Sequence, residues 1–287
     1  MAVVVSRRAC LSVPGDSERM LTKASGLDVD EVVIDLEDAV VPERKALARE
    51  LAVSALAGAD WRAGAVSVRV NAAGSPWCHE DVAALAAAAR RPNTVVLPKV
   101  ESAGDLAFVE RLLAGCERAA GAGDAIGVQA LIETATGVSR VEEIAGASAR
   151  LVGLILGYAD LAASLGGARD ASMWGPVQDA VLIAARANGL QAIDGPFLGV
   201  ADDAAFRAAA GRAAALGFDG KWAIHPVQVG ALLELFSPSA DEVARARAVI
   251  ESLGDGLRGA VAVDGVMVDE AVRLAAERVL ARAEVGA

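Results

Sequence analysis

Two apolar segments of the chain each lead into an acidic residue. Residues 127–134 (GVQALIET) contain Glu133, and residues 151–160 (LVGLILGYAD) end at Asp160. Continuous runs of β-branched and leucine residues are typical of buried parallel strands, and α/β proteins bind ligands at the carboxyl ends of such strands. A pair of carboxylates at that edge suits a divalent metal, and the alternative for each acid taken alone is a cap of the following helix. Together, the two acids favour a metal site.

A further group of acids follows the strand expected at residues 31–36 (EVVIDL). Asp35, Glu37 and Asp38 lie within one turn. Like charges this close cost free energy unless a cation or ordered water balances them, so the outer sphere of a metal would explain the group. The alternative is acidic residues that favour the start of the next helix. Lys99, near the end of a later strand, is interpreted as a residue that only neutralises neighbouring acids.

Three basic residues are candidates for binding an anionic substrate. Arg69 is flanked by valines in a strand expected at residues 65–70, and its planar guanidinium suits a carboxylate or a thioester oxygen. The alternative is a structural ion pair with a nearby acid. Arg19 and Lys23 are four residues apart in a predicted helix, so they share a face near its amino terminus and would clamp a phosphate there. The alternative for this pair is a solvated helix face.

The elements that carry these residues alternate regularly between strand and helix. About eight such units occur in the first 236 residues, and nearly every strand ends in polar residues. This pattern predicts an α/β fold, a TIM (β/α)8 barrel formed by residues 1–236, in preference to an open sheet. A glycine-rich dinucleotide fingerprint is absent from the strand-helix turns.

The remaining residues, 237–287, exceed what a barrel needs. A charged helix at residues 240–253, a short hairpin at 259–268 and a final helix at 269–283 are expected. The glycines around residue 256 indicate a hinge, so this C-terminal extension is predicted to be a lid that covers a site, either its own or that of a neighbouring subunit. The alternative is a terminus that simply docks on the barrel.

Composition excludes several classes of protein. The net charge is −11, aromatic residues are 3% of the chain, and basic residues form no stripe, so nucleic acid is not expected as a partner. No apolar run approaches the roughly 20 residues of a membrane span, and the amino terminus lacks the order of a secretory signal. A cytoplasmic protein is expected. The three cysteines are scattered and odd in number, which favours packed thiols over disulfides.

Motifs in these same segments resemble a known family. LSVPGDSERMLTKA, DLEDAV, VRVN followed by SPW, PKVES, ALIETATGV, GYADLAASLG, AIDGP and GFDGKWAIHP occur in this order. Over nearly its whole length the chain resembles the citrate lyase beta-subunit-like (CitE-like) branch of the HpcH/HpaI aldolase superfamily. The resemblance implies a magnesium-dependent barrel, commonly trimeric, that makes or breaks carbon-carbon bonds in coenzyme A thioesters such as malyl-, citramalyl- or citryl-CoA. The products of cleavage would be an acyl-CoA and a 2-oxo acid.

The resemblance also assigns roles around the metal. It implies that Glu133 and Asp160 are ligands of Mg²⁺, that Glu37 and Asp38 hold metal-bound waters, and that Arg69 binds the substrate and stabilises the thioester enolate. Two alternatives remain open in this family, namely an acyl-CoA thioesterase and the beta subunit of a citrate lyase complex.

Two further roles lie outside the metal site. Arg19 and Lys23 resemble contacts to the phosphates of coenzyme A. Asp269 in the segment DGVMVD matches the acid that, in the lyase and synthase members, enters the site of a neighbouring subunit and moves a proton there. The segment at 174–190 (WGPVQDAVLIAARANGL) departs from many relatives, which leaves the acyl group of the substrate open.

Overall fold

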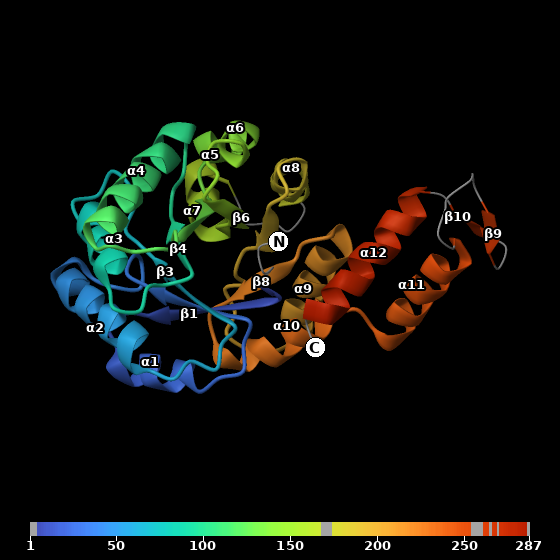
Figure 1. Ribbon diagram of the computed structural model, residues 1–287, viewed down its shortest axis with the longest axis horizontal. Coiled ribbons are helices and arrows are strands. Elements are labelled where there is room, and N and C mark those ends of the chain that lie inside the picture. The colour runs from blue at the N-terminus through green and yellow to red at the C-terminus, as the bar shows by residue number, and fades with distance from the viewer. Residues whose placement is uncertain (1–4, 168–173, 254–260, 264–265, 269, 286–287) are drawn as a thin grey trace.

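Eight parallel strands close into a barrel in the computed structural model, which describes residues 5–167, 174–253, 261–263, 266–268 and 270–285 (Figure 1). Each strand pairs with the next in sequence, and β1 pairs with β8. The predicted TIM barrel is therefore confirmed. The strands are β1 (Ala9–Pro14), β2 (Glu31–Asp35), β3 (Ala65–Arg69), β4 (Thr94–Leu97), β5 (Gly127–Ile132), β6 (Leu151–Leu156), β7 (Gln191–Asp194) and β8 (Gly220–Ala223).

Helices follow the strands and cover the outside of the barrel. Several begin at side chains that accept a hydrogen bond from the first helical turn, as Ser17, Thr134 and Asp203 do, which explains where the chain turns from strand to helix. The helices are α1 (Glu18–Ser25), α2 (Lys45–Gly58), α3 (Cys78–Ala87), α4 (Ala103–Ala119), α5 (Ala135–Ser139), α6 (Val141–Ala145), α7 (Tyr158–Leu165), α8 (Trp174–Ala187), α9 (Ala204–Leu216) and α10 (Val229–Leu235), with 3₁₀ helices η1 (Pro42–Arg44) and η3 (Pro226–Gln228).

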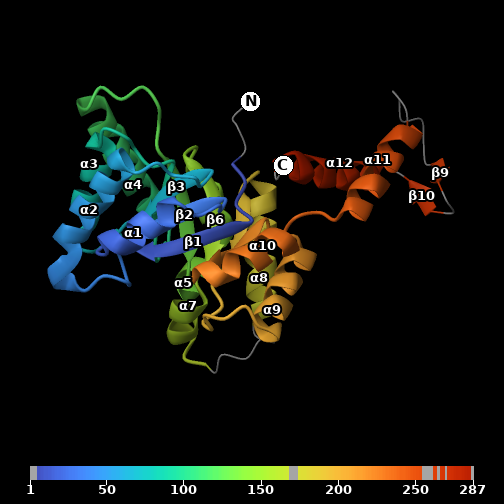
Figure 2. The same cartoon turned by 90° about the horizontal axis from the view of Figure 1, so that it is seen from below.

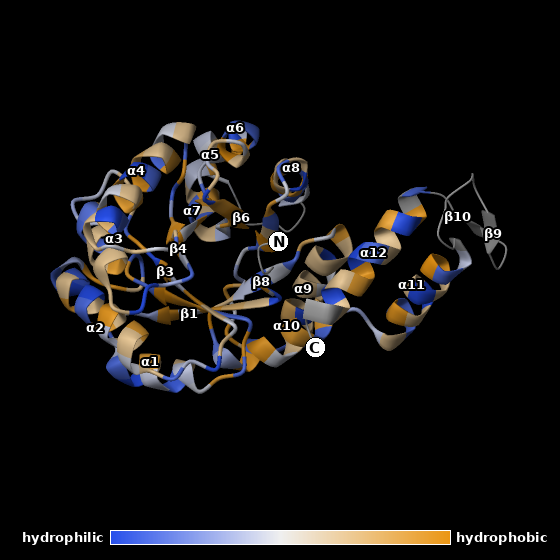
Figure 3. Cartoon of the chain, viewed as in Figure 1, coloured by the Kyte–Doolittle hydropathy of each residue, from blue (hydrophilic) through white to orange (hydrophobic). Residues whose placement is uncertain are grey.

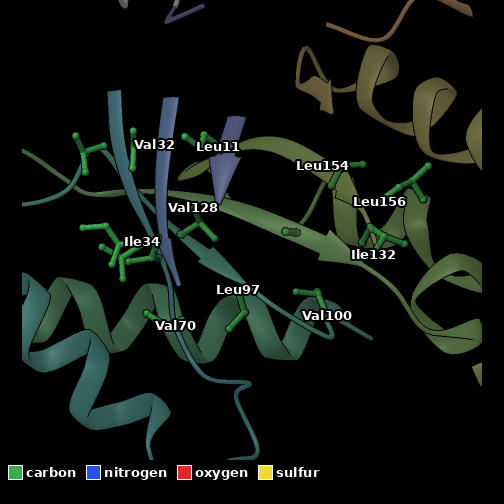
Figure 4. Packing of buried hydrophobic residues seen from close by; sticks show 14 of the residues in the cluster. Leu11, Val32, Ile34, Val70, Leu97, Val100, Val128, Ile132, Leu154 and Leu156 are labelled. Atoms are coloured by element: carbon green, nitrogen blue, oxygen red, sulfur yellow. The ribbon is translucent and has the colours of Figure 1, made fainter. Parts of the chain in front are cut away.

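Side-chain alternation along the strands divides the core into two layers. Residues such as Leu11, Ile34 and Leu154 face the helices and form the larger cluster (Figure 4). Colouring by hydropathy shows the strands as mainly hydrophobic and the helices as mixed (Figure 3). The second cluster fills the barrel interior and consists of Cys10, Val33, Val96, Leu131, Ile155, Ile193 and Trp222. Burial on both faces explains why the strands read as continuous apolar runs.

A polar layer closes the amino-terminal end of the barrel. The Glu31 carboxylate is fully buried, and its Oε1 accepts hydrogen bonds from Ser67 Oγ at 2.6 Å, Gln129 Nε2 at 2.9 Å and Arg7 Nε at 3.2 Å. These residues come from three strands and the segment before β1. Because they bind one another, this end of the barrel is a structural seal, and the carboxyl end is left for chemistry.

The C-terminal extension consists of α11 (Ala240–Leu253), β9 (Val261–Val263), β10 (Val266–Val268) and α12 (Glu270–Val285). Helices α11 and α12 pack against each other and project from the barrel, with the β9–β10 hairpin at the far end (Figures 1 and 2). The predicted bounds of α11 agree with the structure. Within the described ranges, no helix has the length and apolar character required to cross a bilayer.

Two predicted strands end earlier than expected, and the reasons are local. The later strand expected to end near Lys99 ends at Leu97, because Pro98 follows and Lys99 has a φ of 52°, outside the β region. The segment predicted to run to Asp160 ends its strand at Leu156. Asp160 lies in the first turn of α7, where an acidic side chain is favoured by the helix dipole, so it does not lie on the strand itself.

Closure of the barrel predicts that replacing two glycines by alanine has opposite effects on stability. A Cβ at Gly220 in β8 would lie 1.8 Å from the Arg7 carbonyl oxygen, whereas a Cβ at Gly230 in α10 meets nothing within 4 Å. We expect Gly220→Ala to lower the free energy of unfolding by about 3 kcal/mol or more, because backbone must move. Gly230→Ala should raise it by about 0.5 kcal/mol. Urea unfolding curves measure both, and equal stability of the two variants would contradict the packing.

Candidate active site

The predicted acids and Arg69 gather at the carboxyl end of the barrel. Asp35 ends β2 and pairs in register with Arg69, which ends β3. Glu133 follows β5, and β5 lies beside β6, so Glu133 lies next to Gly157. A cavity of about 160 Å³ opens here. It is lined by Ser12, Asp38, Arg69, Leu131, Glu133, Leu156, Gly157, Tyr158, Ala159, Asp160, Pro196, Trp222 and Ile224.

The guanidinium of Arg69 is already bound by acids. Its Nε donates to Asp35 Oδ1 at 2.7 Å and its Nη2 to Asp35 Oδ2 at 2.5 Å. Its Nη1 lies 2.9 Å from Glu37 Oε2. This distance is that of an ion pair, but the angles are not those of a hydrogen bond. Burial disfavours the charged form, but the charge and hydrogen bonds of Asp35 outweigh it and raise the pKa of Arg69. The structural ion pair left open by the sequence is therefore present.

The ammonium of Lys99 lies among three carboxylates. Its Nζ donates to Glu37 Oε1 and lies 3.5 Å from Asp38 Oδ1 and 3.8 Å from Asp160 Oδ1. Burial alone would lower the pKa of Lys99, but the hydrogen bond and charge of Glu37 raise it. Arg69 and Lys99 thus supply positive charge to the acids after β2, as the neutralising role expected for Lys99 requires, and the outer-sphere role of Glu37 and Asp38 stays a prediction.

Glu133 differs from these acids because it lacks a cationic partner. Its side chain is 2% exposed, and its Oε1 accepts a hydrogen bond from the backbone N–H of Lys99 at 2.9 Å. Among the described residues, it forms no salt bridge. Burial and, next, the negative charge of Glu37 raise the pKa of Glu133 to about 8, against the opposing charge of Lys99. A buried carboxylate in this state is stabilised by an added cation.

Oxygen donors from Glu133 and Asp160 fit magnesium. Within the part of the chain that is described, no three His, Cys, Asp or Glu side chains are arranged to hold a metal. Mg²⁺ does not need such a cage, because it commonly binds one or two carboxylates and completes its octahedron with water and substrate oxygens. Asp160 is 37% exposed and faces the same cavity, which leaves room for those ligands.

The other predicted binding residues lie away from this cluster. Arg19 and Lys23 are exposed on α1, and no ion pair links either to another described residue. Their contact with coenzyme A stays a prediction. Asp269 lies outside the described residues. Of the two histidines, His225 caps η3 by accepting a hydrogen bond from the Val227 N–H, and His79 is exposed.

A larger cavity, of about 270 Å³, lies between the barrel wall and helices α8 and α9. Its buried carboxylate, Asp194, is already bonded to Lys221 Nζ and Tyr158 OH. Because this acid has a cation and a hydrogen-bond donor of its own, the cavity offers no carboxylate for a metal. We therefore place the candidate site in the smaller cavity around Glu133.

Sequence reasoning missed two residues of the site, Gly157 and Trp222, and it missed the backbone contact of Lys99. Gly157 lies against Glu133, and a Cβ there would be 2.3 Å from Glu133 Oε2. Trp222 forms part of the cavity wall, with the Arg69 guanidinium 5.6 Å from its ring centroid. Lys99 binds Glu133 through its backbone in a left-handed conformation. Gly157, at a strand-helix junction, carried a usable signal, whereas nothing in the sequence predicts the positive φ of Lys99.

A (β/α)8 barrel with a buried, unpaired carboxylate at the carboxyl ends of its strands has the arrangement of a barrel enzyme. The sequence pattern of the HpcH/HpaI aldolase/citrate lyase family matches residues 8–226, and the chain belongs to this family. The resemblance noted from the sequence motifs is confirmed.

Curated relatives are similar to this chain over almost its full length. The chain is 36% identical to the L-malyl-CoA/beta-methylmalyl-CoA lyase of Cereibacter sphaeroides, over 96% of this chain and 94% of the relative. It is also 36% identical to a (3S)-malyl-CoA thioesterase of the same species, with the same coverage. Among solved structures, CitE of Mycobacterium tuberculosis in complex with magnesium, acetoacetate and coenzyme A is 33% identical, with a TM-score of 0.79 over 97% of this chain and 98% of that chain.

The contact between Gly157 and Glu133 gives a prediction for metal binding. We expect Gly157→Ala to weaken Mg²⁺ binding by roughly tenfold to a hundredfold, because the new methyl group must displace the Glu133 carboxylate. Calorimetric titration with Mg²⁺ measures the effect. Gly175→Ala in α8, where a Cβ meets nothing within 4 Å, is the matched control. Equal affinity in the two variants would show that the position of Glu133 does not matter for the metal.

Proposed function

We propose that the protein is a magnesium-dependent carbon-carbon lyase or synthase that acts on a 2-hydroxy dicarboxylic acyl-CoA thioester, such as malyl-, citramalyl- or citryl-CoA. Cleavage gives an acyl-CoA and a 2-oxo acid. The observation that carries the proposal is the buried Glu133 carboxylate without a cation, beside Asp160 in the cavity. The near full-length likeness to a malyl-CoA lyase, and to a CitE structure that holds magnesium and coenzyme A, supports it.

Glu133 and Asp160 would hold the metal, and Glu37 and Asp38 would orient water around it. When bound, Mg²⁺ supplies Lewis-acid polarisation of the oxygen atoms of a 2-oxo acid or its 2-hydroxy adduct. The low exposure of Glu133 keeps bulk water from that carboxylate. Because it projects from the end of a barrel strand, its position is set by the rigid sheet and needs no reorganisation on binding.

Arg69 would bind the thioester oxygen and stabilise the negative charge that develops on it. Asp35 holds the guanidinium through two hydrogen bonds, so the group is oriented before substrate arrives. Its Nη1, shared between Glu37 and Asp38, lies on the cavity side and is the donor that a substrate oxygen would compete for. Arg19 and Lys23 would bind the phosphates of coenzyme A.

We further propose a site shared between subunits, with the barrel of residues 1–236 completed by the extension of residues 237–287 from a neighbour. Helix α12 begins at Glu270, and the amino-terminal end of this helix, near β10, points away from its own barrel (Figure 1). At 16 residues, α12 is roughly 24 Å long. Asp269, next in sequence to Glu270, would move the proton at the α-carbon of the thioester in a neighbouring barrel. A cytoplasmic homotrimer, or a multiple of it, is the assembly proposed.

A thioesterase is the second candidate function, because a thioesterase relative is also 36% identical over 96% of this chain. Hydrolysis would release free coenzyme A and a 2-hydroxy acid, whereas cleavage would release an acyl-CoA and a 2-oxo acid. A panel of 2-hydroxyacyl-CoA esters with Mg²⁺, with both product pairs measured, separates these functions. Stable association with carrier subunits would instead favour the beta subunit of a citrate lyase complex.

The proposed ligands give a direct prediction. We expect Glu133→Gln and Asp160→Asn each to lower metal-dependent turnover by at least about a hundredfold, because the metal loses one of two protein carboxylates. Turnover is measured with the best thioester of the panel. Both variants should keep the circular dichroism spectrum of the native chain. Full turnover or unchanged Mg²⁺ affinity in either variant would reject that residue as a ligand.

The shared site predicts rescue between two inactive variants. Asp269→Ala lacks the proton-transfer acid, and Glu133→Gln lacks a metal ligand. After subunit exchange, some interfaces pair an intact barrel with an intact extension, so we expect a fraction of native turnover that neither parent shows alone. Mixing without exchange is the control. Absence of rescue, with exchange proven by differently tagged subunits, would show that each extension serves its own barrel.

A further inference from the structure

Lys99 contacts both proposed metal ligands with different parts of the residue. Its backbone N–H donates to Glu133 Oε1 at 2.9 Å, and its Nζ lies 3.8 Å from Asp160 Oδ1. Lys99 thus contacts Glu133, which follows β5, and Asp160, which lies in α7, at the same time. Among the described non-glycine residues, only Lys99 has a positive φ. This conformation costs free energy, and it directs the amide toward one acid and the side chain toward the other.

The ammonium of Lys99 also contacts the acids proposed to orient water around a bound metal. It bonds Glu37 and is 3.5 Å from Asp38, the two residues proposed to hold metal-bound water. Four acidic side chains of the proposed metal environment therefore interact with one lysine. A simple surface ion pair would engage one or two of them.

The side chain of Lys99 is less enclosed than that of Arg69. Lys99 is 33% exposed, in contrast to 12% for Arg69, whose fork is fixed by Asp35. A lysine on a flexible four-carbon stem can withdraw into solvent while its backbone stays in place. Two cations within ion-pair distance of Asp160 would repel each other, so an arriving Mg²⁺ and the ammonium compete for the same carboxylates.

From this geometry we propose that Lys99 is a tethered internal cation. In the metal-free protein its ammonium holds Glu37, Asp38 and Asp160 together, and when Mg²⁺ binds it withdraws, so that this lysine sets the metal affinity of the site. The proposal rests on Glu133 and Asp160 being the metal ligands. Its backbone N–H keeps Glu133 in place in both states, because the amide contact does not depend on the side chain.

The test measures metal binding in the purified metal-free protein, with Mn²⁺ as the probe and free Mn²⁺ quantified by electron paramagnetic resonance. Lys99→Met removes the charge but keeps the length of the side chain and the amide. We expect it to bind Mn²⁺ roughly tenfold more tightly than the native chain, since the competing cation is gone. Lys99→Arg, which keeps the charge, should bind like the native chain. Arg118→Met, an exposed residue in the last turn of α4, controls for the change in net charge.

Thermal unfolding gives a second measurement without turnover. Without metal, Lys99→Met should have a lower Tm than the native chain, because the acids lose their counter-ion, and saturating Mg²⁺ should restore it. Native-like or weaker Mn²⁺ affinity in a folded Lys99→Met variant would overturn the proposal. If Glu133→Gln also binds Mn²⁺ like the native chain, the metal site itself is wrong. If Glu133→Gln loses Mn²⁺ while Lys99→Met is unchanged, only the role of Lys99 is wrong.

The native chain provides a test that does not depend on the folding of a variant. It contains four lysines, Lys23, Lys45, Lys99 and Lys221. With ¹³Cε-labelled lysine, four side-chain signals are expected, and the one missing from Lys99→Arg identifies Lys99. Added Mg²⁺ should shift this signal most as the ammonium leaves Glu37. A Lys99 signal that does not move at saturating Mg²⁺ would also overturn the proposal.

Discussion

The excess of negative charge at the carboxyl end of the barrel is the constraint on which the site depends. Five acids face two basic side chains there, and the basic groups are shared unequally. Arg69 is bound mainly by Asp35, and Lys99 by Glu37, which leaves Glu133 without a cation. Burial without a cation in an ion pair explains why the pKa of Glu133 rises to about 8. The carboxylate that would gain most from an added positive charge is therefore Glu133, and a hard divalent cation such as Mg²⁺ supplies that charge.

The barrel makes this costly arrangement stable. The strands are buried on both sides, and the polar layer around Glu31 seals their amino ends, so the free energy of folding comes from parts of the molecule remote from the acids. Parallel strands in consecutive order then bring their carboxyl ends to one rim. Repulsion among the acids and the positive φ of Lys99 are tolerated there because the sheet fixes the backbone on both sides.

The fold and the acidic residues of the site could be predicted from the sequence, because periodic apolar runs and the polar residues that end them are local signals. The ion pairs between those residues could not be predicted from the sequence. Asp35 and Arg69 are 34 residues apart in the sequence, and only the register of β2 with β3 shows that Asp35 forms an ion pair with Arg69. Similarly, Asp160 was assigned to a strand end, but Gly157 ends the apolar run and starts α7, which carries Asp160. Partner choice depends on tertiary geometry that residue types do not encode.

The choice between the two candidate reactions, carbon-carbon cleavage and hydrolysis, is expected to depend on residues outside the barrel. A lyase and a thioesterase are both 36% identical to this chain over 96% of its length, so likeness to these relatives does not separate the two chemistries. Both reactions develop negative charge on the thioester oxygen, and the role proposed for Arg69 would serve either one. They differ in which proton is moved and in whether water reaches the thioester carbonyl. The family pattern ends at residue 226, before α11 and α12, and the acid assigned to proton transfer lies in the extension. We therefore expect the extension, and the interface that positions it, to determine the reaction.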